Sequence, residues 1–240
     1  MVHTENPVDL KPTLTLDGIE MMFATNVLGH FLLTNLLMPK IIAAAKTAAK
    51  GSVRIINLSS TGTYVSALRV SDINFQKPTT ELPEKEKPAL AMLNQACLKC
   101  DETMAYIPTV AYGQSKTCSI LLSVAWSSRL FEKYGILSLA LNPGEIQTEL
   151  GRHTDADWLD RAVKQRQAMG IHLWKTLGGG ASTTMVTACD PKLGLPADDG
   201  SGYYLSDCQI AKAPGYATDR EDAEKLWEIS EGLTGEKFAW

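Results

Sequence analysis

Apolar and polar residues alternate with a helical period over residues 109–134. Ile120, Leu121, Val124 and Phe131 fall on one stripe of a helix, and they do not follow the two-residue period of a half-exposed strand. Such a long, strongly apolar pattern is typical of a helix in the core. We therefore predict one buried helix over 109–134.

Two short apolar runs flank this helix, residues 52–59 before it and 136–144 after it. The first ends in serines and the second in a Pro-Gly turn, so each predicts a buried strand. Strand, helix and strand in this order predict a parallel crossover unit, in which ligands bind beyond the carboxyl ends of the strands. We expect Ser60, Tyr112 and the turn of Pro143 and Gly144 at that edge of the sheet.

The remaining elements are predicted from shorter patterns. Thr15 is a plausible N-cap for a helix of about 30 residues that carries apolar positions as far as Leu36. The glycines at 178–180 follow no strand and lack the Gly-Lys-Ser/Thr of a phosphate loop, so they predict a helix start. Residues 202–206 predict a last short strand, and residues 219–231 a surface helix.

The stretch between Ser60 and Tyr112 is rich in Lys, Glu and Pro, above all at residues 77–88. A connection of this length without regular structure is uncommon in a compact domain, and is usually a functional lid, a binding loop or a disordered insertion. Loop-closure entropy grows slowly with length, so the stretch does not preclude a site. We interpret residues 61–108 as an inserted loop in a single domain that spans residues 1–240.

Tyr112 and Lys116 lie four residues apart on the predicted helix and therefore share a face. A phenol is a weak acid with an unperturbed pKa of about 10, and a cation held close to it favours the phenolate. Lys116 supplies such a cation one helical turn away. The same spacing also occurs in ordinary amphipathic pairs, so the neighbouring motifs have to decide between the two interpretations.

Asn26 lies among the apolar residues of the first predicted helix. A polar side chain there must find hydrogen-bond partners, because an unpaired one lowers stability. It is either a core asparagine that binds backbone groups or a member of a functional polar network. His30, four residues further on, has no carboxylate or second histidine at metal-ligand spacing, and we interpret it as structural.

Four motifs follow one another along the chain. Asn26 lies in Thr-Asn-Val-Leu-Gly-His-Phe, Ser60 ends Asn-Leu-Ser-Ser, Tyr112 precedes Lys116 in the long helix, and residues 142–148 read Asn-Pro-Gly-Glu-Ile-Gln-Thr. With this set the sequence resembles the short-chain dehydrogenase/reductase family, in particular its retinol-dehydrogenase-like and fungal branches. The resemblance implies an α/β fold with a doubly wound parallel sheet of Rossmann type.

The resemblance also implies a catalytic site and a cofactor. Tyr112 would be the general acid in carbonyl reduction and the general base in alcohol oxidation, and Ser60 would hydrogen-bond the reacting oxygen. Lys116 would favour the phenolate and hold the nicotinamide ribose, and Asn26 would bend its helix and hold a water that links Lys116 to solvent.

The implied cofactor is NADP, with NAD as the alternative, and the implied substrate is a small hydrophobic carbonyl compound or alcohol. The implied cofactor contacts are Tyr112, Lys116, Pro143, Gly144, Ile146 and Thr148.

By the same resemblance, residues 145–175 would cover the substrate. Their apolar side chains could line a pocket or belong to the core, because aromatic residues at helical spacing occur in both. The candidates are Trp158, Met169, Ile171 and Trp174.

The family begins with a strand, a glycine-rich turn and a helix that receive the cofactor's pyrophosphate. No such fingerprint precedes Thr15, so we expect a partial Rossmann sheet that lacks its first strands, in a chain that is N-terminally truncated relative to the family. The strand at 52–59 would then lose a neighbour and have an open apolar edge. We expect marginal stability or association through that edge, with a homo-oligomer as one form.

Two functions follow from these observations. The first is an NADP(H)-dependent oxidoreductase that interconverts a carbonyl and an alcohol. The alternative is a truncated, catalytically incompetent paralogue or incomplete gene model, which would act, if at all, by association with a full-length relative. Fold-level analogy does not identify the substrate.

Composition restricts the partners. The chain has 240 residues, 45% of them hydrophobic, enough for one domain with a sizeable core. Its net charge of −4, with both signs interspersed, argues against nucleic acid and anionic membranes as partners. We find no apolar stretch near the roughly 20 residues of a membrane span, and no signal-peptide pattern at the start. We therefore expect a soluble, cytoplasmic protein whose partner is a small molecule.

The five cysteines are an odd number without a secretory signal, which indicates reduced thiols. Cys97 and Cys100 have the spacing of a metal or redox pair, but no second pair or His-x-x-x-His completes a zinc shell, so we expect no metal. We interpret Cys118, Cys189 and Cys208 as small buried hydrophobes.

Overall fold

The computed structural model describes residues 11–95, 100–146, 160, 163–164, 174–194, 196 and 202–240. In these residues four strands form one sheet in the order β1-β2-β3-β4. The strands β1 (Arg54–Leu58), β2 (Leu137–Asn142) and β3 (Tyr204–Ser206) run parallel, and β4 (Gln209–Ile210) pairs with β3 in the antiparallel sense. The register places Leu58 opposite Leu141, and Leu141 opposite Leu205.

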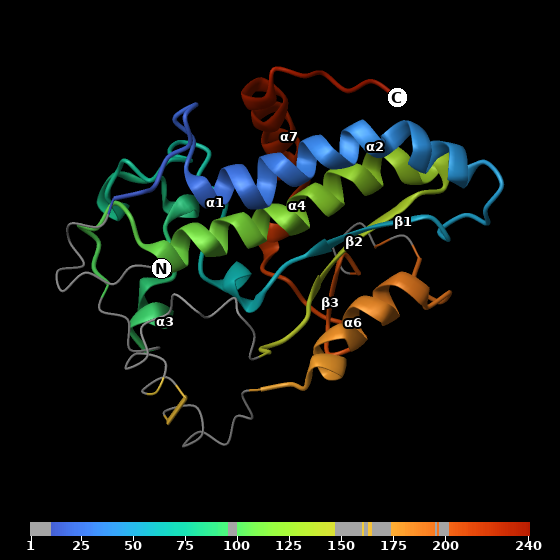
Figure 1. Ribbon diagram of the computed structural model, residues 1–240. Coiled ribbons are helices and arrows are strands. Elements are labelled where there is room, and N and C mark those ends of the chain that lie inside the picture. The colour runs from blue at the N-terminus through green and yellow to red at the C-terminus, as the bar shows by residue number, and fades with distance from the viewer. Residues whose placement is uncertain are drawn as a thin grey trace.

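Helices cover both faces of this sheet (Figure 1). On one face α4 (Pro108–Tyr134) packs against β1 and β2, and it also contacts α2 (Gly29–Ala45) and α7 (Arg220–Thr234). On the other face lies α6 (Leu177–Cys189). The chain is therefore an α/β protein with a partial Rossmann sheet, as predicted.

The long helix was predicted almost to the residue. Pro108 occupies its first turn, where a missing N–H costs nothing, and Gly135 ends it in the left-handed conformation with φ of 70°. The predicted strands at 52–59 and 136–144 are confirmed in shorter form. The helix start at 178–180 is also confirmed, because Thr176 caps α6 by accepting from the Gly179 N–H. The last predicted strand and the surface helix are present as β3 and α7.

The predicted start of the first helix is wrong. Thr15 begins a turn, in which its N–H donates to the Ile19 carbonyl, and Gly18 has φ of +76°. The helix starts with α1 (Met21–Phe23), where the Glu20 carboxylate accepts from the Phe23 N–H. Thr15 has the residue type of an N-cap, but the left-handed Gly18 between it and α1 prevents a helix from starting there.

The prediction that no apolar stretch approaches the length of a membrane span is also wrong. The continuous helix Met21–Ala45 is long and apolar enough to cross a membrane by length and composition. The sequence reading was misled by uncharged polar residues in this stretch, which carries no Asp, Glu, Lys or Arg over residues 21–39. One side of the helix, with Phe23, Phe31 and Met38, is buried in the hydrophobic core. A cytoplasmic location stays a prediction.

The cysteines differ in burial. Cys118 in α4 is fully buried, as predicted, but Cys189 and Cys208 are exposed. Cys189 is the last residue of α6, where the helix ends. Cys208 lies in the tight β3–β4 turn with φ of 63°. Cys97 lies outside the described residues, so a Cys97–Cys100 pair is not described.

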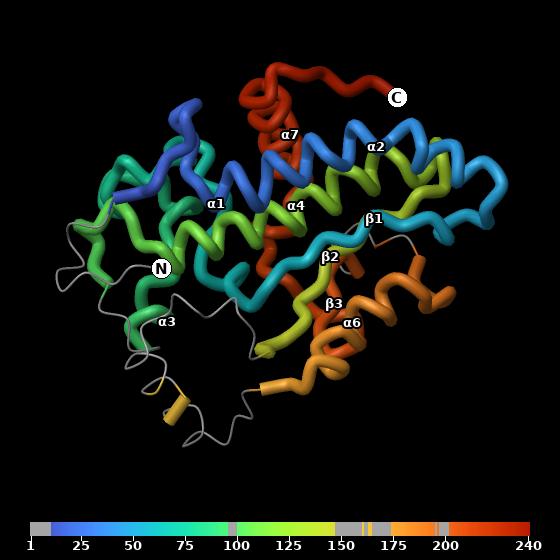
Figure 2. The backbone as a smooth tube through the Cα atoms, viewed as in Figure 1, coloured from blue at the N-terminus to red at the C-terminus, as the bar shows by residue number. Residues whose placement is uncertain are grey.

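The described parts of the segment 61–108, residues 61–95 and 100–108, pack against the amino-terminal end of α4 (Figure 2). It contains short 3₁₀ turns and the helix α3 (Leu90–Gln95). Most of its buried apolar side chains form a second hydrophobic cluster with the start of α4, separate from the main core. This cluster consists of Val65, Phe75, Leu93, Met104, Tyr106, Ile107, Val110 and Ala111.

Aromatic rings join three helices in the main core. Phe31 of α2 contacts the rings of Trp126 in α4 and Trp227 in α7, with centroid distances of 6.3 and 4.8 Å. Phe238 and Trp240, in the carboxyl-terminal tail, pack on Phe31 and Trp227 respectively. Such offset and edge-on contacts fix α4 relative to α2 and α7.

The outer edge of β1 has no strand beside it in the part of the chain that the structure describes. Whereas all of β2 is buried, Leu58 at the end of β1 is 51% exposed. The Arg54 side chain does not cover the free edge of β1. Its guanidinium donates to the Thr187 and Asp190 carbonyls at the end of α6, both at 2.7 Å. The expected open edge is therefore seen in the described residues, and it lacks the charges that usually block pairing.

We predict that the purified chain self-associates through this edge. Leu58→Lys places a charge on it and should shift the sedimentation-velocity distribution toward the monomer, because edge lysines disfavour strand addition. The matched control is Leu33→Lys on the exposed side of α2, where Leu33 is 56% exposed, and it should not change association. A wild-type chain that sediments as a single monomer and melts cooperatively would contradict the prediction.

Candidate active site

The carboxyl ends of β1 and β2 bring two of the predicted motifs together. The Ser59 N–H donates to the Leu141 carbonyl at 2.7 Å, which extends the parallel pairing by one residue past β1. Ser60 then leaves the sheet beside the point where Pro143 and Gly144 leave β2. These three residues are half-buried at the sheet edge that was predicted for ligand binding.

The two serines that follow β1 have different environments. Ser59 is buried, and its hydroxyl donates to the Lys116 carbonyl at 2.7 Å. Ser60 is half-buried, and its Oγ accepts from the Gly62 N–H at 3.2 Å as the N-cap of a 3₁₀ turn, Thr61–Tyr64. Ser59 thus fastens α4 to the strand end, whereas Ser60 keeps its hydroxyl proton for another acceptor.

Tyr112 and Lys116 lie on one face of α4, at the same sheet edge. The Lys116 Nζ is 5.6 Å from the centroid of the Tyr112 ring, and it donates to the Leu58 carbonyl at 3.0 Å. Burial lowers the pKa of the Lys116 ammonium. Within the described residues no carboxylate forms an ion pair with it, so the backbone carbonyl and the aromatic ring are its recorded partners.

Two glycines allow Tyr112 and Ser60 to come together. A Cβ atom on Gly113 would lie 2.6 Å from the Gly62 carbonyl oxygen, a distance that real Cβ atoms do not adopt. A Cβ atom on Gly62 would lie 3.1 Å from the Tyr112 ring. The backbone after Ser60 therefore touches α4 at Gly113, and the Tyr112 ring packs over Gly62.

Asn26 lies in a π-helical turn, Ala24–Leu28, between α1 and α2. The wider turn is marked by the bond from the Gly29 N–H to the Ala24 carbonyl, which spans five residues. The Asn26 Nδ2 donates to the Ser115 Oγ at 3.0 Å, and that hydroxyl donates to the Tyr112 carbonyl at 2.8 Å. The side chain thus contacts α4 through Ser115, and among the described residues it makes no hydrogen bond with the Lys116 ammonium.

The loop after β2 is described only in part. The Gly144 N–H donates to the Asn142 Oδ1 at 3.1 Å, and Gly144 has φ of +84°, a conformation that favours glycine. Ile146 pairs with Lys175 in an isolated parallel bridge and packs where a Cβ atom on Gly180 would lie. Trp174 is 45% exposed. Four predicted residues lie outside the described ones: Thr148, Trp158, Met169 and Ile171.

The arrangement gathers a phenol, an ammonium group and a free hydroxyl donor at one sheet edge. A phenol beside a cation can exchange a proton with a bound oxygen, and a serine hydroxyl can stabilise charge on the same oxygen. His30, on α2, is exposed, and no group of three metal-ligating side chains occurs in the described part of the chain. These groups fit proton transfer to or from a substrate oxygen.

Comparison with known proteins gives the family. The chain is 36% identical over 221 residues to the short-chain dehydrogenase TIC 32 A, chloroplastic, of Brassica napus, covering 90% of this chain and 58% of that protein. It is 31% identical over 223 residues to retinol dehydrogenase 14 of Mus musculus, covering 93% and 55%. The chain belongs to the short-chain dehydrogenase/reductase family. It spans little more than half the length of these relatives.

A solved structure is similar to this chain in fold. An uncharacterized protein from Mycobacterium paratuberculosis superposes with a TM-score of 0.57 at 26% identity, covering 96% of this chain and 65% of that one. No protein-family model matches the sequence.

Sequence reading missed the residues that bring the short-chain dehydrogenase/reductase motifs together. Gly62, Gly113 and Ser115 are all small, and each lies at a close approach of α4 to a neighbour. The sequence feature that could have indicated these contacts is the small residues next to Ser60 and Tyr112. A contact between two glycines far apart in the chain leaves no pattern in either segment alone.

We predict that Gly113→Ala displaces α4 from the 3₁₀ turn. The added methyl group must push the Gly62 carbonyl away, which should lower the free energy of unfolding by about 1–3 kcal/mol, as overpacking does. Chemical denaturation measures this change. The matched control is Gly178→Ala in α6, where an added Cβ atom meets nothing within 4 Å. This substitution should raise the free energy of unfolding by about 0.5–1 kcal/mol, because alanine favours a helix more than glycine does. Equal effects of the two substitutions would refute the close contact.

Proposed function

We propose that this member of the short-chain dehydrogenase/reductase family is an NADP(H)-dependent oxidoreductase. It would interconvert a carbonyl and an alcohol on a small hydrophobic molecule, with Ser60, Tyr112 and Lys116 as catalytic residues and Asn26 in support. The observation that carries the proposal is the position of the Lys116 ammonium 5.6 Å from the Tyr112 ring centroid, at the end of β1.

Two of these side chains, Ser60 and Lys116, have a contact that suits the proposed role. The Tyr112 hydroxyl gives a proton to the substrate oxygen in reduction and takes it back in oxidation. The Ser60 Oγ already accepts from the Gly62 N–H, so its own proton is directed to another oxygen, here that of the substrate. The Lys116 ammonium lies beside the Tyr112 ring, and the Leu58 carbonyl holds it at the strand end.

The residues at the sheet edge fit the nicotinamide end of a dinucleotide. Gly144, with φ of +84°, lies between the half-buried Pro143 and Ile146, and the Lys175 side chain packs against it, so Lys175 would have to move for a cofactor to contact Gly144. Tyr112 and Lys116 supply hydroxyl and ammonium donors that would hold the ribose, and Thr148 belongs to the same proposed contact set. When bound, the nicotinamide group supplies or accepts the hydride.

We assign Asn26 a supporting role in the proton path. Its π-helical turn interrupts the regular pattern of backbone hydrogen bonds on the side of the helix that contacts α4. A water held there would connect the Lys116 ammonium to solvent. The Asn26 side chain would keep the turn in place through Ser115.

The decisive substitution is Tyr112→Phe. It removes the proton donor and keeps the ring over Gly62, so kcat for carbonyl reduction should fall about 10²–10⁴-fold while the melting temperature stays close to that of the wild type. The matched control is Tyr134→Phe at the far end of α4, which should leave kcat unchanged. If Tyr112→Phe turned over at the wild-type rate, the assignment of Tyr112 would be wrong.

Cofactor binding is tested by titrating the purified chain with NADPH and with NADH. Nicotinamide fluorescence and thermal stability are followed together, because a ligand that binds only the folded state stabilises it by about 2.7 kcal/mol at one hundred times its Kd. We expect saturable binding of NADPH, weaker binding of NADH, and a marked loss of both in Lys116→Met. A flat titration with both cofactors would contradict the proposal.

A second candidate function is association without turnover. The open edge of β1 supports it, since an unpaired strand can receive a strand from another chain. This function predicts that the purified chain neither binds nicotinamide cofactor nor turns over substrate, and that a charge at Leu58 abolishes its association. Saturable NADPH binding by the isolated chain would favour the oxidoreductase.

A further inference from the structure

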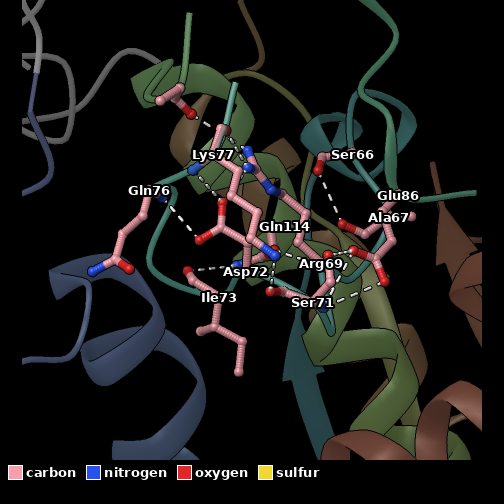
Figure 3. A network of polar contacts seen from close by, with 11 residues as sticks. Ser66, Ala67, Arg69, Ser71, Asp72, Ile73, Gln76, Lys77, Glu86 and Gln114 are labelled. Carbon is pink, nitrogen blue, oxygen red and sulfur yellow. Dashed lines mark hydrogen bonds and ion pairs between the residues drawn. The ribbon is translucent and has the colours of Figure 1, made fainter. Parts of the chain in front are cut away.

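Gln114 lies in α4 between the two proposed catalytic residues of that helix, but it faces the other way. Two residues from Tyr112 is about 200° of helical rotation, so Gln114 points into the segment 61–108. Its side chain is completely buried. Its Oε1 accepts from the Arg69 N–H at 3.0 Å and its Nε2 donates to the Ile73 carbonyl at 3.4 Å. One amide side chain therefore holds both ends of the loop 69–73 (Figure 3).

The loop that Gln114 binds is held from within by a buried ion pair. The Arg69 guanidinium donates to the Asp72 carboxylate at 2.5 Å and to the Lys77 carbonyl at 2.9 Å, and it stacks 4.2 Å from the centroid of Phe75. The Asp72 carboxylate also accepts the N–H groups of Gln76 and Lys77, at 2.8 and 2.9 Å. Arg69 and Asp72 are only 1% and 8% exposed. Both charges are paired and hydrogen-bonded, although the buried Arg69 Nε has no partner among the described residues, and these bonds hold residues 69–77 together.

A further carboxylate fixes the next part of the loop. Glu86, 3% exposed, accepts from the Ser71 N–H at 3.2 Å and from the Ser71 hydroxyl at 2.5 Å. The loop is thus fastened on one side to residues 84–86 and on the other to α4 (Figure 3).

This loop is continuous in sequence with Ser60. From Ser60 the chain passes Gly62, which touches α4 at Gly113, and then Ser66, whose carbonyl accepts from the Thr117 hydroxyl at 2.7 Å. It then reaches Arg69 and the Gln114 contact. The segment 60–73 therefore contacts the first turns of α4 at two places, through Gly62 and through Arg69. The distance between Ser60 and Tyr112 depends on both contacts.

We propose that Gln114, held by the Arg69–Asp72 loop, is a positioning residue that sets the rotation of α4 and with it the place of Tyr112 relative to Ser60. This positioning role rests on the proposed function, because turnover depends on the place of Tyr112 relative to Ser60. A displacement of about 1 Å at a reacting group can lower a rate about 100-fold, so loss of the two Gln114 contacts should reduce kcat strongly.

The test compares Gln114→Met with Ser127→Ala. Met keeps the length of the side chain and removes both contacts to the loop. Ser127 is the matched control, because it is buried in the same helix and its hydroxyl also makes two contacts, to the carbonyl and the N–H of Ser138 at 2.8 and 3.0 Å. Both variants should melt below the wild type. Only Gln114→Met should lower kcat, by about 10- to 100-fold, with KM changed less than about threefold.

A second readout does not need turnover. Labelling the 7 tyrosines with 3-fluorotyrosine and assigning the Tyr112 signal with Tyr112→Phe gives a fluorine resonance at the site in the protein without ligands. We expect the Tyr112 resonance to shift or broaden in Gln114→Met and to stay in place in Ser127→Ala. If Gln114→Met does not fold, Gln114→Leu, which also removes both contacts without burying a charge, replaces it with the same expected shift.

The outcomes separate the two proposals. A Tyr112 resonance that stays in place in the Gln114 variant overturns the positioning role, whatever the activity. Equal kcat in Gln114→Met and Ser127→Ala overturns it as well. If the wild type has no turnover with NADPH and carbonyl compounds, the proposed function fails, and the fluorine comparison still decides whether Gln114 positions Tyr112.

Discussion

Everything at the sheet edge depends on the burial of α4 from all sides. The helix packs on the sheet, on α2, on α7 and on the segment 61–108, and its buried residues occur on every face of its central turns. A helix in that situation cannot rotate or slide without opening cavities in several interfaces at once. Core packing therefore fixes the central turns of α4, and the place of Tyr112 in its first turns depends in addition on the contacts with residues 60–73.

Small polar residues make this burial compatible with a close approach to the sheet. Ser119 and Ser123 donate to the carbonyls of Ser115 and Ser119, one turn earlier in α4, so their hydroxyls need no space beyond the helix. Ser123 also accepts from the Asn57 Nδ2 of β1 at 2.8 Å. Larger apolar residues at these positions would separate α4 from the strand whose end holds the Lys116 ammonium.

The sequence predicted the elements whose pattern is local. The helix of α4, the two strands beside it and the glycine start of α6 each have a periodicity or a cap that can be read within a short window. The start of the first helix was misplaced because Thr15 and Glu20 are both competent N-caps, and only the turn at Gly18 decides between them. Exposure of Cys189 and Cys208 was missed for a similar reason, since it depends on where α6 and the β3–β4 turn end.

For the candidate site, the sequence supplied the reactive side chains, and their surroundings came from the fold. Ser60, Tyr112 and Lys116 were proposed from spacing and family resemblance, and the structure brings their segments to one edge. The Gly62–Gly113 contact and the loop around Arg69 join residues more than forty positions apart, so no window of the sequence contains them. A buried cation such as Arg69 is also unexpected in a segment whose composition resembles that of a solvent-exposed linker.

The π-helical turn at Ala24–Leu28 changes how this helix would respond to a deletion. A π turn contains one residue more than an α turn. The helical segments before and after it therefore keep the same faces toward the core, although one additional residue lies between them. Removing one residue from α2 would rotate the helix after the deletion by about 100° and turn Phe31 or Met38 away from the core. Removing one from the π turn would leave a regular helix with Phe23 and Phe31 still facing inward. The turn is thus the one place in this helix where natural length variation could occur without loss of the fold.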